Sequence, residues 1–145
     1  MKTYTDLPQS KKLAEFLPLE SADMCYGYIA PYEFSDRMYD GGYDDVPYPK
    51  DFLKRNPNFS EDEYDGSLPC WSLAALLSVL PFHLIVNNQR YTFSMIKGLD
   101  KNGETYAIKY AIFNTTFYLH LTDFYNNPVD ACYEMIIRLN ELKML

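Results

Sequence analysis

The chain has 145 residues, of which 48% are hydrophobic, and a net charge of −7, so it is long enough for one globular domain. This apolar content excludes a wholly disordered chain, and the acidic balance disfavours nucleic-acid binding through phosphate neutralisation. The longest nearly apolar stretch, residues 73–86, is shorter than the roughly 20 residues of a membrane-spanning helix, and no apolar leader follows Met1. We expect a single cytoplasmic domain without membrane contact, and nothing in the sequence specifies an oligomeric state.

The three cysteines, Cys25, Cys70 and Cys132, are widely spaced and form no CxxC pair. An odd number of isolated cysteines predicts reduced thiols rather than a disulfide framework. Together with the two scattered histidines they offer no paired zinc ligands, and no nucleotide-binding motif occurs. We therefore expect no metal and no cofactor.

Residues 1–32 predict a short helix followed by a strand. Asp6 or Ser10 can cap a helix over about residues 8–16, and Pro18 ends it. The stretch MCYGYIAPY (24–32) alternates as a strand does. The residues that share one face are Met24, Tyr26, Tyr28 and Ala30.

Residues 33–66 predict an acidic insertion rich in Tyr, Pro and Gly. From Tyr32 to Gly66 there are ten acidic and four basic residues, and the rest of the chain is nearly neutral. The segment contains Gly41-Gly42 and lacks a lasting helical or strand period, although a short helix around Tyr48–Arg55 is expected. Insertions of this length in compact domains are usually functional.

The stretch DGSLPCWSLAALLSVLP (65–81) predicts a buried central helix over about residues 69–80. Ser67 can cap it, Pro69 suits its first turn, and Pro81 ends it. Its residues are apolar on nearly every side, which is typical of a helix packed on more than one face.

Residues 82–124 alternate in the manner of strands and are divided by turn residues, which predicts an antiparallel meander of three or four strands. Pro128 then opens an amphipathic C-terminal helix. Its apolar stripe is Val129, Cys132, Ile136, Leu139 and Leu142. The expected fold is α+β, with a sheet of about four strands, to which strand 24–32 can be added, packed against the central and C-terminal helices.

Cys70 is the one candidate nucleophile. A thiol in the first turn of a helix can have a lowered pKa. The stretch GSLPCWS, followed by antiparallel strands with histidines, resembles papain-like cysteine hydrolases. That resemblance implies Cys70 as nucleophile and His83 or His120 as base.

The spacing of the histidines argues against catalysis. His83 and His120 are opposite in phase to their apolar neighbours, so both are expected to point away from the core. In a four-strand meander they lie on opposite edge strands, roughly 14 Å apart, so at most one could serve Cys70. A structural Cys70 is the favoured interpretation and a cysteine hydrolase the alternative.

The acidic, tyrosine-rich segment is the favoured functional feature. Interfaces favour tyrosine, and clustered negative charge steers towards basic partners. We expect a non-catalytic protein-interaction module that binds a protein with a basic surface; an acidic DNA mimic is a further alternative. The candidate binding residues are Tyr39, Tyr43, Asp44, Asp45, Tyr48 and Tyr64.

Three stretches, KLAEFLPLESADM (12–24), LPCWSLAALLSVLP (68–81) and NPVDACYEMIIRLNELKML (127–145), carry a further resemblance. Together they resemble a family of small uncharacterised proteins encoded by phages and mobile elements of gut bacteria. The resemblance implies an accessory protein of a mobile element and assigns no activity to any residue.

Overall fold

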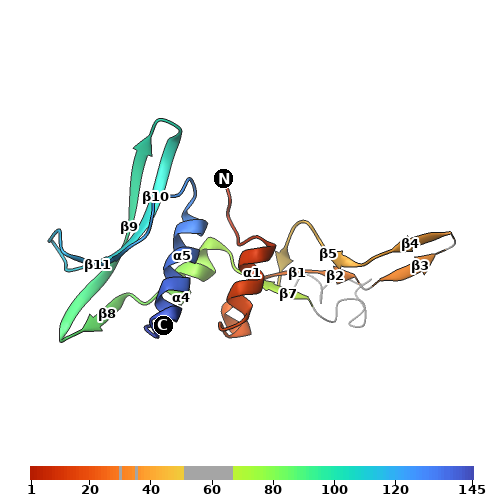
Figure 1. The fold of residues 1–145 in the computed structure, drawn as a ribbon, viewed down its shortest axis with the longest axis horizontal. Helices are drawn as coiled ribbons and strands as arrows, with labels where there is room; N and C mark the ends of the chain where they lie inside the picture. Colours follow the sequence, from red (N-terminus) through yellow and green to blue (C-terminus); the bar gives the residue numbers. More distant parts are fainter. Residues whose placement is uncertain (30, 35, 51–66) are drawn as a thin grey trace. The chain divides into compact units, whose positions relative to one another are not determined.

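A computed structural model describes residues 1–29, 31–34, 36–50 and 67–145 (Figure 1). The chain divides into two compact units: unit 1 is Met1–Thr5 with Leu73–Leu145, and unit 2 is Asp6–Ser72. Both contain helices and antiparallel strands, which confirms the α+β class. The single domain with an insertion at 33–66 stays a prediction; the described part of that insertion belongs to unit 2.

Unit 2 begins with helix α1 (Leu7–Ala14), close to the range that the sequence predicts. Asp6 and Gln9 form a capping box, in which each side chain accepts a hydrogen bond from the other residue's backbone N–H. A short 3₁₀ turn, η1 (Leu19–Ser21), follows Pro18.

The sheet of unit 2 has β1 (Met24–Tyr26) at its centre. β6 (Tyr48–Pro49) pairs with one edge of β1 and β7 (Leu68–Cys70) with the other, both antiparallel. Beyond β1 the chain continues into two further strand pairs. They are β2 (Tyr28–Ile29) with β5 (Gly42–Tyr43) and β3 (Tyr32–Phe34) with β4 (Arg37–Tyr39).

This arrangement corrects two predictions. The strand expected over 24–32 is broken into β1, β2 and the start of β3, and β1 pairs in unit 2 instead of joining the four-strand sheet. Tyr48–Pro49 form β6, so the helix expected from Tyr48 does not begin there, and residues 51–55 lie outside the described residues. Proline is tolerated in β6 because this is an edge strand.

The central helix expected over 69–80 is also wrong in its first part. Leu68–Cys70 form strand β7, and helix α4 covers only Leu73–Val79. The physical reason is pairing with β1, a partner more than 40 residues away that no local pattern announces. Pro69 fits because β7 is an edge strand and one of its sides needs no backbone donor.

Unit 1 contains the predicted antiparallel meander, in the order β11-β10-β9-β8. Its strands are β8 (His83–Val86), β9 (Gln89–Asp100), β10 (Gly103–Ala111) and β11 (Tyr118–Leu121). Asn87 and Asn88 join β8 to β9 with φ values of 51° and 64°. Two consecutive positive φ values are typical of the type I′ turn that suits a two-residue hairpin.

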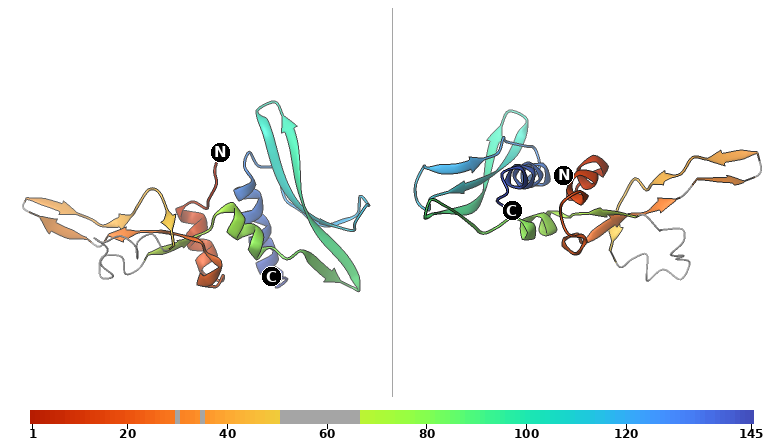
Figure 2. Two further views of the ribbon diagram at one scale, coloured as in Figure 1. Left: turned by 180° about the vertical axis from the view of Figure 1, so that it is seen from behind. Right: turned by 60° about the horizontal axis from the view of Figure 1, so that its bottom comes forward.

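Helix α5 (Pro128–Glu141) lies along one face of this curled sheet (Figure 2), and α4 packs against α5. Val129, Cys132, Ile136 and Leu139 are fully buried, as their helical spacing predicts, whereas Leu142 is 52% exposed at the end of the helix. Across from α5 the sheet contributes Ile108 and Tyr110, also fully buried. No helix in the described part of the chain is long and apolar enough to cross a membrane.

Replacing the N-cap of α5 tests this packing. The Asn127 side chain accepts a hydrogen bond from the backbone N–H of Asp130 at 2.9 Å, and Asn127 is only 5% exposed. Asn127→Ala should lower the free energy of unfolding by about 1 kcal/mol, because a helix N–H loses its partner. Asn127→Ser keeps an acceptor and should recover most of that loss in urea denaturation. Equal destabilisation by both variants would contradict the capping role.

Candidate functional site

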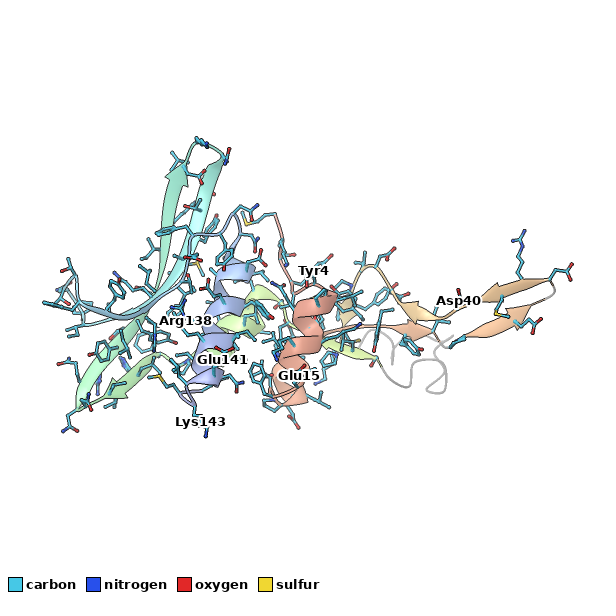
Figure 3. The ribbon with its side chains drawn as sticks, in the orientation of Figure 1. Tyr4, Glu15, Asp40, Arg138, Glu141 and Lys143 are labelled. Carbon is cyan, nitrogen blue, oxygen red and sulfur yellow. The ribbon has the colours of Figure 1, made fainter. Side chains whose placement is uncertain are left out.

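The described residues of 28–45 in unit 2 (28–29, 31–34 and 36–45) form a two-stranded ribbon, which we call the acidic arm. It consists of the β2–β5 and β3–β4 pairs and the two residues after β5. Figure 3 labels Asp40 on it. The arm has five acidic residues and one basic residue, Arg37. The acidic residues are Glu33, Asp36, Asp40, Asp44 and Asp45, and all except the partly buried Asp44 are exposed.

Contacts at the base of the arm fix its conformation. Tyr28 and Tyr43 pair across β2 and β5, and their rings contact at a tilt, with centroids 5.1 Å apart. The ammonium of Lys11 lies 5.4 Å from the Tyr43 ring centroid, within the range of a cation–π interaction. The backbone N–H of Asp44 donates to the carbonyl of Gly27 at 2.9 Å.

The arm requires glycine at position 41, where its backbone passes close to Pro31. Gly41 has a φ of 80°, and a Cβ atom here would lie 2.8 Å from the Pro31 ring and 2.9 Å from the Ile29 carbonyl oxygen. Only glycine combines this backbone conformation with such a close approach. The Gly41-Gly42 pair therefore builds the ribbon, although in the sequence it suggests a loop.

The structure gathers four of the candidate binding residues near the base of the arm: Tyr43 in β5, Asp44 and Asp45 after it, and Tyr48 in β6. Tyr39 lies in β4, opposite Tyr32. Tyr64 lies outside the described residues. Sequence reasoning missed Tyr28 and Lys11, and the alternation of residues 24–32 was the one available signal for Tyr28.

Cys70 is fully buried in strand β7, where it pairs with Met24. It does not stand at a helix N-terminus, because α4 begins three residues later. The predicted place of this thiol in the first turn of a helix is therefore wrong. Both histidines of the chain belong to unit 1, so Cys70 has no histidine within its own unit.

The two histidines lie on opposite edge strands, as expected, but they face opposite sides of the sheet. His83 in β8 is exposed and approaches the Thr92 hydroxyl at 3.4 Å, on the side away from α5. His120 in β11 pairs with the fully buried Tyr110, so its side chain is on the α5 side. The expectation that His120 points away from the core is wrong, because the neighbouring Phe117 is the residue that is exposed, at 73%.

The environment of His120 disfavours its protonated form. Its Nε2 atom is buried without a hydrogen-bond partner among the described residues. Burial and the nearby Arg138 guanidinium together lower the pKa of His120. Arg138 is itself held by the Leu121 carbonyl at 2.7 Å and the Glu134 carboxylate at 2.7 Å.

The thiols of Cys25 and Cys132 are weaker acids than an ordinary cysteine. Burial raises the pKa of Cys132 to about 12 and also raises the pKa of Cys25, where the positive charge of Lys50 partly opposes the shift. Among the residues that the structure describes, no group of three His, Cys, Asp or Glu side chains could hold a metal ion.

Comparisons with protein-family models, with curated proteins and with solved structures find no match to this chain. The resemblance to proteins of phages and mobile elements stays a prediction.

Alkylation of the native protein tests the placement of Cys70. Iodoacetamide should leave Cys70 unlabelled until the chain is denatured, because the side chain is 0% exposed. The matched control is Ser67→Cys, an exposed position just before β7, which should label at the rate of an ordinary thiol. Rapid native labelling of Cys70 at neutral pH would reopen the hydrolase alternative.

His120 predicts a pH dependence of stability. Because its folded-state pKa lies below the ordinary value of 6.5, the unfolded chain binds the proton more readily. Its contribution should be fully present above about pH 6.5 and should be lost as the pH falls towards the folded-state pKa. His120→Gln should flatten this part of the stability profile in urea titrations, whereas the control His83→Gln should leave it unchanged. An unaltered slope in His120→Gln would contradict the assignment.

Proposed function

We propose that the chain is a non-catalytic protein-interaction module whose acidic arm binds a protein with a basic surface. The observation that carries this proposal is the arm itself, a ribbon that combines five acidic residues with paired tyrosines.

The charge of the arm favours a basic partner. Unit 2 has fourteen acidic and six basic residues, a net charge of −8, whereas unit 1 has six acidic and seven basic residues. The negative charge of the chain therefore lies in the unit that contains the arm. Such a concentration accelerates the encounter with a positive surface and disfavours negative ones.

The tyrosines of the arm supply contact area. Tyrosine is enriched at protein interfaces because its ring is large and its hydroxyl group can still form hydrogen bonds. Tyr28 and Tyr43 are only partly buried, so each retains accessible surface. Two exposed side chains, Met38 in β4 at 73% and Val46 just after the arm at 56%, add apolar area.

A matched pair of variants tests this proposal. Asp40→Asn/Asp44→Asn/Asp45→Asn removes three arm charges, and Glu15→Gln/Glu20→Gln/Glu141→Gln removes three exposed charges elsewhere. Proteins captured by the immobilised wild-type chain should bind the arm variant about tenfold more weakly, and they should be released by moderate salt. The control variant should bind them as the wild type does.

A backbone variant separates shape from charge. Gly41→Ala keeps every acidic residue but forces a Cβ into Pro31 and the Ile29 carbonyl. It should weaken capture while leaving the circular-dichroism spectrum of the rest of the chain largely intact. If the Gly41→Ala variant and the arm variant both still capture the same proteins as the wild type, the proposal is wrong. Release of the captured proteins by double-stranded DNA would identify the partners as DNA-binding proteins and favour the DNA-mimic alternative.

A further inference from the structure

The sheet face of unit 1 that α5 does not cover is apolar and basic, and we call it the open face. Side chains alternate along a strand, so residues that pair across neighbouring strands share a face. Ile85 pairs with Arg90, and Lys109 pairs with Ser94, both on the side opposite Tyr110. The residues that define the open face are Phe82, Ile85, Arg90, Lys109, Phe113 and Phe124.

The apolar side chains of the open face are exposed in the single chain. Phe82 is 67% exposed, Ile85 68% and Phe113 75%. Phe124, 51% exposed, lies over Gly98, where a Cβ would come within 3.5 Å of its ring. Single exposed apolar residues are normal, but several aligned on one sheet face are typical of a surface that another protein covers.

A groove of about 350 Å³ runs across the open face between Phe82 and Phe113. Thr92, Ser94 and Lys109 contribute to its lining, so a basic group and two hydroxyl groups lie between aromatic rings. This lining suits a segment that carries both a carboxylate and an aromatic or apolar side chain.

The basic groups of the open face have no acidic partner. Arg90 and Lys109 form no ion pair with any residue that the structure describes. On the α5 side, by contrast, Lys97 pairs with Glu104 at 2.9 Å. The open face therefore presents two basic groups, without an ion pair among the described residues, beside exposed apolar side chains.

We propose that the open face binds the acidic arm of a second copy of this chain. This inference rests on the proposed function, because it identifies the arm's partner. The arm offers carboxylates at Asp40, Asp44 and Asp45, on the same ribbon as the Tyr28–Tyr43 ring pair. Charge complementarity and the exposed Phe side chains both point to this occupant.

The contact is heterologous, because the arm and the open face are different surfaces. Each chain has one of each, so copies assemble head to tail into a closed ring or an open chain. The arm of one copy neutralises the basic groups of the next and covers its exposed rings.

Sedimentation velocity of the full chain tests this assembly. The wild type should associate at low salt, and its self-affinity should fall at least about tenfold at high salt. The arm variant Asp40→Asn/Asp44→Asn/Asp45→Asn and the face variant Arg90→Gln/Lys109→Gln should each be monomeric. A mixture of the two should form one-to-one dimers that grow no further, because only one complementary pair of surfaces remains. Lys101→Gln/Lys143→Gln, with two exposed lysines altered elsewhere, should behave as the wild type does.

Carbodiimide cross-linking identifies the contact directly. In a mixture of ¹⁴N- and ¹⁵N-labelled chains, Lys109 of one chain should be linked to Asp44 or Asp45 of the other, and mass spectrometry distinguishes these links from those within one chain. Links found only within single chains would show that a chain's own arm occupies its open face, and the inference would be wrong.

The outcomes separate this inference from the proposed function. A wild type that stays monomeric, or self-association that survives in the face variant, overturns the inference. If the arm variant still loses captured proteins in that case, the proposed function stands. If it loses none, both are wrong.

Discussion

The pairing of β1 on both of its edges is the constraint on which the acidic arm depends. A two-stranded ribbon is only marginally stable in water by itself, and this one begins and ends in a three-stranded sheet. Cys25 and Tyr26 of β1 are 7% and 2% exposed, so the base of the arm is part of a core. β7 then leads into Trp71, which is fully buried and donates its indole N–H to the Ser21 hydroxyl at 2.9 Å. The chain is thus anchored where it enters the arm and where it passes on to α4.

Features that depend on short-range sequence were predictable. The cap at Asp6, the two-residue turn at Asn87-Asn88 and the stripe of α5 each involve residues within a few positions of one another. Backbone preferences and side-chain period suffice for such features. The meander was predictable as well, because every strand in it pairs with the next strand along the chain.

Features that depend on distant partners or on exposed faces were not predictable. Pro69 and Cys70 were assigned to a helix because a proline before an apolar run commonly opens one, and only β1 reveals the edge strand. The arm lacks an in–out period because much of both its faces is accessible, so alternation carries no signal. His120 was assigned to the wrong side of the sheet because its apolar neighbours in the sequence were expected to face the core. In this sheet the face away from α5 is apolar as well, with Phe82 and Ile85 exposed on it.

The charge of the chain decides how such an apolar face can behave. Exposed rings on a sheet invite indiscriminate association, and a net charge of −7 opposes it through mutual repulsion between copies. That repulsion is concentrated in unit 2, whereas the exposed apolar side chains share the open face of unit 1 with Arg90 and Lys109. A partner that brings carboxylates to these two basic groups removes the repulsion at the point where it covers the rings. In the contact that we propose, attraction and burial act together, so the segregation of charge between the units favours selectivity as well as affinity.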